Sequence, residues 1–321
     1  MSGKPIVSRD AFKALPHAVT LLGMSGVGKT VLSSGLRKSG GWFHYSADYR
    51  IGTRYLAEDI IDNIKYKIMQ MDDGFVANLL RSDSIYINHN ISVENLEPVS
   101  TFLGMFGDAA KGGLDKPTFL ERQGLYRDAE IASMIEVSRF IAKARRIYGC
   151  TNFVNDASGS LVEIADPGDA NDPVVEALRA ETLVLYLEAD DAYEQEILAR
   201  AKAHPKPMFY NPDFIGPRIE SQPDDGNGVD PVKFARPLFP DLLAFRKPRY
   251  RQFAENFGFT IPARQIFDIV DVRSRNVDAD AFLDQVYDAV THAASASGDA
   301  ADNLGRYVDI CERRRRDAEA D

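Results

Sequence analysis

The chain has 321 residues, of which 45% are hydrophobic and 27% are charged, as is ordinary for a soluble globular protein that can bury a core of useful size. Its formal net charge of −10 argues against a broad nucleic-acid-binding surface, because such surfaces are usually basic overall. We therefore expect no nucleic-acid partner, while a local basic pocket for a phosphorylated ligand stays compatible with the composition.

The two cysteines, Cys150 and Cys311, lie far apart in the sequence. A disulfide framework is not expected, and neither cysteine stands in a metal-ligand cluster, which fits a reducing compartment. The N-terminal stretch lacks the long apolar core of a signal peptide, and no apolar run approaches the length of a membrane-spanning helix. We expect a cytoplasmic protein without a membrane partner.

The first predicted elements form a single unit. Residues 18–22 (AVTLL) predict a buried strand, and a glycine-rich stretch, GMSGVGKT, follows at residues 23–30. A helix then ends near Gly40, and residues 42–45 (WFHY) predict a second strand. Strand, glycine loop, helix and strand make the βαβ unit that a phosphate-binding loop needs.

The next segment is predicted to be mainly helical. Apolar residues at helical spacing indicate helices over 55–71, over 94–106 and, as one long or two abutting helices, over 117–148. We treat about 52–148 as a helical insertion between the second and third strands, which is large by the standards of α/β proteins.

Alternation of strands and helices resumes after the insertion. Strands are predicted at 151–156 and 182–189, and a helix at 191–203. Residues 204–248 are rich in Pro, Gly and Asp and predict a long surface loop. A helix over 245–258, an edge strand FTIPA and a last helix over 277–294 follow, and the tail ERRRRDAEAD is interpreted as a solvated run of charges.

The stretch GMSGVGKT fits the phosphate-loop pattern G-x-x-x-x-G-K-[ST]. Its glycines allow positive φ and close approach to an anion, and the N–H groups at the following helix start face phosphates. Lys29 is expected to reach the β- and γ-phosphates, and the Thr30 hydroxyl to ligate Mg²⁺. The predicted nucleotide-binding residues are Gly23, Ser25, Gly26, Val27, Gly28, Lys29, Thr30 and Val31.

A phosphate loop needs a second acidic group to hold the metal, directly or through water. Asp156 ends the apolar strand NFVND, where such a carboxylate is expected. The alternative is that Asp156 only caps the turn ASGS. Asp48, which follows the second strand, is the other candidate for this role.

Four separated segments resemble the shikimate kinase-like branch of the P-loop small-molecule kinases. They are GMSGVGKT with its helix, HYSADYRIGTRYL with Ser46, Asp48 and Ile51, the segment LVLYLEADDAYEQEILARAKAHPKP with Arg200, and RKPRYRQFA with Arg246. Together they cover about half of the chain in the order of the family. Bacterial proteins described only as ATPases share this pattern.

The resemblance implies one α/β P-loop NTPase domain over 1–321, with a five-stranded parallel sheet and helices on both faces. It also implies ATP and Mg²⁺, an acceptor-binding insertion and a lid over about 200–245. In the family, an arginine in the place of Arg200 approaches the phosphates, and one in the place of Arg246 contacts the acceptor.

Two departures from the family pattern bear on the acceptor. Ser46 replaces the first family aspartate, so metal support can fall to Asp156. The family's glycine triplet after the third strand is represented here by NDASGS, with only Gly159. Because that loop helps to seat the acceptor in the family, we expect an acceptor other than shikimate.

Asp48 is a candidate to orient an acceptor hydroxyl and to accept its proton. Arg50 and Arg54 are spaced i,i+4 and share a face if the segment is helical, which suits an anionic acceptor held by bidentate contacts. The alternative is a solvated helix face. Elsewhere, Arg122 and Arg127 are expected at the surface, whereas Phe209 and Tyr210 are expected to pack.

Three functions follow from these patterns. The first is a small-molecule kinase with Lys29, Asp48 and Arg200 as catalytic residues. The second is an ATPase switch acting on a protein partner through the helical insertion; no N-K-x-D segment supports GTP specificity. The third is a kinase of a macromolecule, for which the acidic charge disfavours nucleic acid but not protein.

Overall fold

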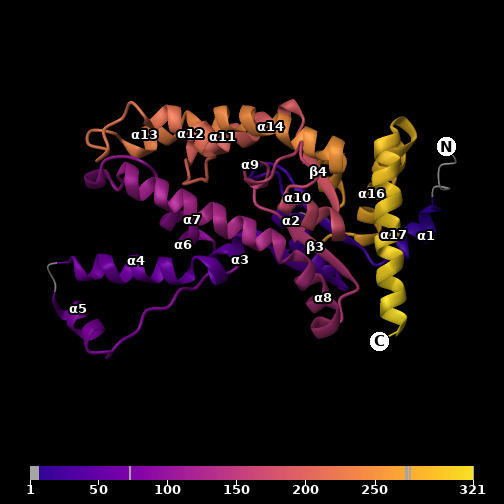
Figure 1. Ribbon diagram of the computed structural model, residues 1–321, viewed down its shortest axis with the longest axis horizontal. Helices are drawn as coiled ribbons and strands as arrows, with labels where there is room; N and C mark the ends of the chain where they lie inside the picture. The colour runs from indigo at the N-terminus through magenta and orange to yellow at the C-terminus, as the bar shows by residue number, and fades with distance from the viewer. Residues whose placement is uncertain (1–6, 72–73, 272–273, 275, 321) are drawn as a thin grey trace. The chain divides into compact units, whose positions relative to one another are not determined.

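The computed structural model describes residues 7–71, 74–271, 274 and 276–320 (Figure 1). The chain divides into two compact units. The first contains the described residues of Met1–Ala47, Ile131–Ala203 and Phe239–Asp321, and the second contains those of Asp48–Glu130 and His204–Leu238. Both units are therefore assembled from stretches that are separated in the sequence.

A parallel sheet of five strands in the order β2-β3-β1-β4-β5 forms the centre of the first unit. The strands are β1 (Ala18–Leu22), β2 (Trp42–Ser46), β3 (Asn152–Asp156), β4 (Leu183–Glu188) and β5 (Gly258–Pro262). Every residue of β1 is buried, as its apolar run predicts. The five-stranded parallel sheet is confirmed, with β5 at an edge.

Successive side chains of each strand point to opposite faces of the sheet, so both faces carry apolar side chains. Helices cover both faces and bury these side chains. On one face, Val19 and Leu185 share a core with α2 (Lys29–Ser39), α16 (Ala279–Ala296) and α17 (Gly298–Ala320). On the other face, Tyr45 packs on Phe140 of α8 (Val137–Tyr148), with 4.9 Å between ring centroids. Tyr186 stacks there on Tyr250 of α14 (Leu238–Phe257) at 5.3 Å.

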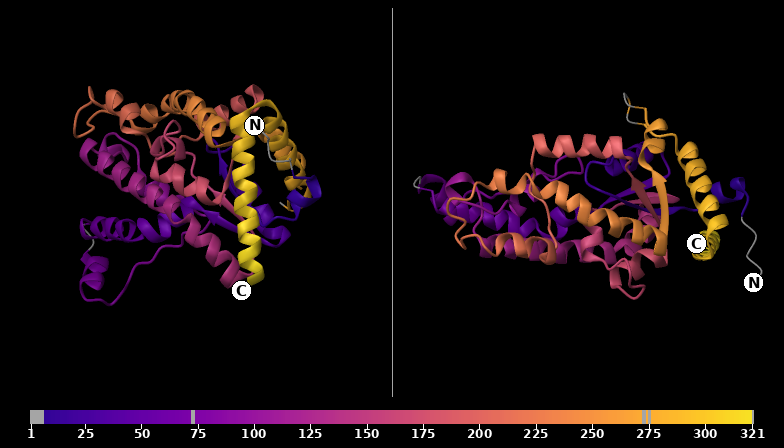
Figure 2. Two further views of the ribbon diagram at one scale, coloured as in Figure 1. Left: turned by 45° about the vertical axis from the view of Figure 1, so that its right-hand side comes forward. Right: turned by 90° about the horizontal axis from the view of Figure 1, so that it is seen from above.

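The C-terminal segment forms a long helix that the sequence patterns did not predict. The tail ERRRRDAEAD was expected to be a solvated run of charges, and residues 315–319 are exposed as expected. They nevertheless continue helix α17, which runs to Ala320 and packs along α16 (Figure 2). Tyr307 and Cys311 of α17 are fully buried. An apolar stripe therefore runs through a polar sequence, and burial of that stripe rather than local charge makes the segment a helix.

The remaining helices of the first unit are short or peripheral. They are α1 (Arg9–Lys13), α9 (Leu161–Ile164), α10 (Pro173–Glu181), α11 (Asp191–Ala203) and α15 (Ala263–Asp268). Helix α10 was not predicted, although its start carries a recognisable signal. The side chain of Asp172 accepts from the N–H groups of Val174 and Val175, and Pro173 occupies the first helical position.

The second unit is built from helices and an aromatic core. Its helices are α4 (Ala57–Met69), α5 (Gly74–Arg81), α6 (Glu97–Leu103), most of α7 (Lys116–Ile135), α12 (Pro212–Ile219) and α13 (Pro231–Ala235). Phe106 contacts Phe119 at 6.2 Å and Phe234 at 5.2 Å between ring centroids. This contact joins the two separated stretches of the unit.

The stretch 204–248 was predicted to be a long surface loop, and that prediction is wrong in part. It contains α12, α13 and the start of α14. The side chains of Asn211 and Asp230 cap α12 and α13, each followed by a proline in the first turn. Two of the prolines that suggested a loop, Pro212 and Pro231, therefore mark helix starts. Their role as a lid stays a prediction.

Two side-chain expectations in the second unit have different outcomes. Phe209 and Tyr210 are buried, and Phe209 stacks on Tyr126 at 5.6 Å, which confirms that they pack. Arg122 was expected at the surface but is buried, donating to the Phe102 carbonyl and, at 2.7 Å, to Asn63 Oδ1. Burial lowers the pKa of Arg122 from its ordinary value. Arg127 is exposed, as expected.

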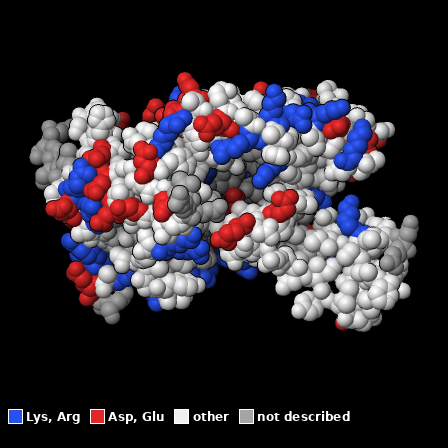
Figure 3. Space-filling view, turned by 180° about the vertical axis from the view of Figure 1, so that it is seen from behind, with Lys and Arg blue, Asp and Glu red and all other residues white. Residues whose placement is uncertain are grey.

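Basic and acidic side chains lie next to one another over the face drawn in Figure 3. None of the helices in the described part of the chain is both long enough and apolar enough to span a bilayer.

Candidate functional site

The chain leaves β1 through a loop that only glycine fits at two positions. Gly23 and Gly28 have φ of +146° and +99°. A Cβ on Gly28 would lie 2.6 Å from Cζ of Phe267, and one on Gly23 would lie 3.0 Å from the carbonyl oxygen of Leu187. Both the backbone conformation and the neighbouring atoms therefore exclude larger residues.

Lys29 opens α2 directly after this loop. Its side chain is buried, and Nζ donates to the carbonyls of Gly23 at 2.6 Å and Met24 at 3.3 Å. The ammonium is thereby held across the loop. The neighbouring Ser25, Gly26, Thr30 and Val31 are exposed, whereas Val27 is buried in the core.

Arg200 of α11 reaches the same loop. Its Nη2 donates to the Gly26 carbonyl at 3.2 Å, and its guanidinium lies over the Tyr193 ring, 5.8 Å from the centroid. Tyr193 also donates its hydroxyl to the Gly26 carbonyl at 3.1 Å and meets Phe267 edge to face. The structure thus brings Arg200 and Lys29 to one loop, flanked by two aromatic residues that the sequence patterns missed.

Asp156 lies at the carboxyl end of β3, in register with Leu21 of β1. It is buried, and His44 Nε2 lies 3.4 Å from its Oδ2. The His44 side chain is 1% exposed, and its Nδ1 has no hydrogen-bond partner among the described residues. The His44 imidazole is therefore placed to orient the Asp156 carboxylate.

The helix that carries Arg246 contacts the phosphate loop and the segment that follows β3. Arg246 Nε donates to Glu163 Oε1 at 2.5 Å, both side chains are almost fully buried, and Arg246 Nη1 lies 3.8 Å from Met24 Sδ. Tyr250, one turn on, donates to the Gly159 carbonyl. Arg246, which the family resemblance assigns to the acceptor, is thus placed beside the loop but bonded to Glu163.

Gly159 brings the segment after β3 against the phosphate loop. A Cβ on Gly159 would lie 3.0 Å from the backbone nitrogen of Ser25. The single glycine retained in NDASGS is therefore needed for close packing of two backbones.

The predicted acceptor residues Asp48, Arg50 and Arg54 belong to the second unit. Asp48 is half-buried, and its Oδ1 accepts from the Tyr126 hydroxyl at 3.0 Å. Arg50 lies over the Tyr55 ring at 5.8 Å, and Arg54 is exposed. Ile51–Tyr55 forms one turn of π-helix, a rare form that is frequent at functional sites.

The residues of the first unit fit a nucleotide with Mg²⁺. The loop offers backbone N–H groups at the start of an eleven-residue helix, and Lys29 and Arg200 add positive charge. Mg²⁺ prefers oxygen ligands and is held in nucleotide sites by one or two protein groups plus phosphates. The Thr30 hydroxyl and the Asp156 carboxylate supply such oxygens. No cluster of three or more His, Cys, Asp or Glu that could hold a metal occurs among the described residues.

Comparison with known proteins gives only remote structural likeness. No family model and no curated protein matches the chain. Among solved structures, the chain is similar to the shikimate kinase from Acinetobacter baumannii in complex with shikimate, at 17% identity and a TM-score of 0.36. The match covers 81% of this chain and 96% of that one. A likeness this weak leaves the chemistry to be argued from the site.

Proposed function

We propose that the chain is an ATP-dependent phosphotransferase that moves the γ-phosphate to a small, anionic, hydroxyl-bearing acceptor. The observation that carries this proposal is the convergence of Lys29 and Arg200 on one glycine loop at a helix start. Two cations beside a row of backbone N–H groups favour a polyphosphate over a neutral ligand.

In this proposal, each site residue of the first unit has a distinct role in binding ATP and Mg²⁺. Backbone N–H groups of the loop cradle the phosphates, while Thr30 and Asp156 hold Mg²⁺, with His44 orienting Asp156. When bound, Mg²⁺ neutralises charge on the phosphate oxygens. Tyr193 and Phe267 flank the loop and keep Arg200 and Gly28 in place.

In the transfer step, the acceptor oxygen forms a bond to the γ-phosphorus while the bond to the β-phosphate oxygen breaks, and ADP leaves. Lys29 and Arg200 stabilise the negative charge on the transferring group. Asp48, held by Tyr126, accepts the proton of the acceptor hydroxyl.

Arg50 and Arg54 bind the anionic group of the acceptor in this proposal, and Arg246 is a third candidate. Arg246 is the least accessible of the three, because its guanidinium is 1% exposed and bonded to Glu163, whereas Arg50 is half-buried and Arg54 is exposed.

The alternative is an ATPase that switches a protein partner. It is favoured by large apolar side chains that lie exposed on and next to α4 and α5 of the second unit. These are Tyr66, Met71, Phe75 and Tyr86, exposed at 61%, 58%, 69% and 88%. Large exposed apolar side chains that lie close together are typical of surfaces that bind another protein.

The test is ATP turnover with Mg²⁺, following label from the γ-phosphate with and without a pooled extract of small metabolites. Label on a small molecule, lost in Lys29→Ala, supports the kinase and identifies its acceptor. Release of free phosphate alone, unaffected by the extract, rejects the kinase in favour of the switch.

A further inference from the structure

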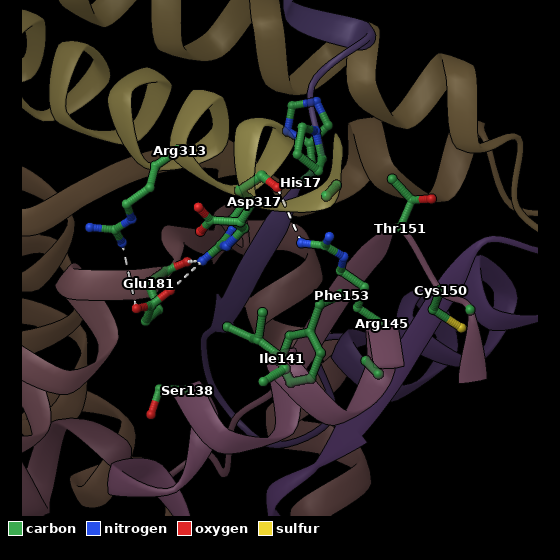
Figure 4. A pocket seen from close by; sticks show the side chains of 16 residues that line it. His17, Ser138, Ile141, Arg145, Cys150, Thr151, Phe153, Glu181, Arg313 and Asp317 are labelled. Atoms are coloured by element: carbon green, nitrogen blue, oxygen red, sulfur yellow. Dashed lines mark hydrogen bonds and ion pairs between the residues drawn. The ribbon is translucent and has the colours of Figure 1, made fainter. Parts of the chain in front are cut away.

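A second polar site lies at the opposite end of the sheet from the phosphate loop. A cavity of about 430 Å³ opens beside the amino ends of β1 and β3 (Figure 4). The phosphate loop follows the carboxyl end of β1, and five residues of strand separate the two ends by about 16 Å. The cavity is large enough for a small organic molecule.

The lining combines an apolar floor with a basic rim. Ile141 of α8 and Phe153 of β3 supply apolar surface. Arg145 comes from the last turns of α8, and Arg313 and Arg314 come from those of α17. The acidic lining residues are Glu181 and Asp317, so three arginines face two carboxylates.

The arginines are held in place by the ends of neighbouring helices. Arg314 Nη2 donates to the carbonyl and, at 2.9 Å, to the carboxylate of Glu181, and Arg313 lies 3.6 Å from the same carboxylate. Arg145 Nη1 donates to the Arg314 carbonyl at 3.3 Å, extending from α8 toward α17 (Figure 4). The basic rim is thus built before any ligand arrives.

The three arginines of this rim carry one more positive charge than the two carboxylates neutralise. Nε and Nη1 of Arg314 are buried and have no acceptor among the described residues. Buried donors without acceptors are costly, and an anion in the cavity would offset part of this cost through its charge, without bonding to these two atoms.

We propose that this cavity is a binding site for a small organic anion with a flat apolar body and a phosphate or carboxylate group. The apolar body lies on Ile141 and Phe153, and the anionic group meets the guanidinium of Arg145 and those of α17. The site is separate from the proposed nucleotide site and does not depend on it.

Cys150 provides a local reporter, because it lines the cavity and its side chain is partly exposed. The other thiol, Cys311, is fully buried, and burial raises its pKa to about 11, so it reacts slowly at neutral pH. The rate of Cys150 labelling by N-ethylmaleimide therefore measures access to this cavity, and Cys150→Ser should abolish the signal.

The experiment adds phenyl phosphate, benzoate or neutral benzyl alcohol during labelling of the full chain. We expect phenyl phosphate or benzoate to slow labelling saturably, with benzyl alcohol having no effect; whichever anion protects identifies the preferred group. Arg145→Gln should weaken protection by about tenfold or more. The matched control is Arg146→Gln, next on α8, exposed and outside the lining.

Protection should persist unchanged in Lys29→Ala, because that change acts only on the phosphate loop. Absence of saturable protection, equal protection in Arg145→Gln, or its loss in Lys29→Ala would each overturn the proposal. If Arg145→Gln does not fold, Ala142→Trp, at an exposed lining position, tests the same site by filling it. Undiminished protection in that variant also overturns the assignment.

Discussion

Lys29 bonds to two carbonyls of the loop through a buried ammonium group. We predict that Lys29→Ala lowers phosphoryl transfer by roughly 10²–10³-fold, as removal of one preorganised charge-stabilising donor typically does. Transfer of γ-label measures the effect. Lys38→Ala, at an exposed position late in the same helix, is the matched control. Full activity of Lys29→Ala would rule out a nucleotide role for this loop.

Asp48 accepts a hydrogen bond from Tyr126 and is only half-buried. Asp48→Asn keeps the shape but removes the base, so we expect ATP binding to be unchanged and transfer to fall by roughly 10²–10⁴-fold. Nucleotide titration and single-turnover transfer separate the two quantities. Asp128→Asn, exposed on α7, should leave both unchanged. An unaltered transfer rate in Asp48→Asn would remove this residue from the proton transfer.

Among single residues, those of the phosphate loop could be predicted from the sequence, because its glycines and lysine follow a fixed local spacing. His44, Tyr193 and Glu163 were missed because each acts through a partner far away in the chain. His44 meets Asp156 across 112 residues, and Glu163 meets Arg246 across 83. A motif defined by spacing within one segment cannot predict contacts between residues so far apart in the sequence.

Helix α14 is joined to α9 by the buried pair of Arg246 and Glu163. Glu163→Gln leaves a buried guanidinium without its counter-charge, so we expect a loss of roughly 3–5 kcal/mol in the free energy of unfolding. The double change Glu163→Leu with Arg246→Met should recover most of that loss. Urea unfolding measures both variants.

The control for this pair lies on the same helix. Lys247 bonds to Glu194 at 2.5 Å, but both side chains are about one-fifth exposed. Glu194→Gln should therefore cost about 1 kcal/mol or less. A similar cost for both glutamates would show that burial adds nothing to the pair of Arg246 and Glu163.

Among the elements, strands were predicted most closely, because fully buried parallel strands are continuous apolar runs bounded by polar residues. Residues 18–22 match β1 in both ends. Helices α12, α13 and α17 were missed, since their sequences are polar or rich in Pro and Gly. Their apolar faces can be recognised only when the surfaces against which these helices pack are known.

Stability of the whole protein should depend on pH through His17. Burial first, and then the charge of Arg314, lower its pKa from 6.5 to about 4 in the folded chain. Between these values the unfolded state binds a proton that the folded state excludes. Stability is therefore complete above pH 6.5 and falls by roughly 3 kcal/mol as the pH drops to 4.

Urea unfolding at pH 7, 5.5 and 4.5 checks this dependence. His17→Gln should flatten the curve across that interval, while His292→Gln, at an exposed position of α16, should reproduce the wild-type curve. A wild-type slope that persists in His17→Gln would assign the effect to other groups.

For the whole molecule, the resemblance of four ordered segments was sufficient to predict the parallel sheet. The sequence was interpreted as one domain, and it left open whether the helical insertion forms a separate unit. Pairing of Asp48–Glu130 with His204–Leu238 depends on contacts such as Phe106 with Phe234, which link residues more than a hundred positions apart.

The interleaving of the two units has a consequence for the chain as it is synthesised. All residues of the second unit have been made once Leu238 is added. The sheet still lacks β5 until Pro262, and α16 and α17, which complete its core, follow later. The helical unit, although inserted into the other, can therefore finish folding first on the ribosome, while the unit that begins at the N-terminus waits for its last strand.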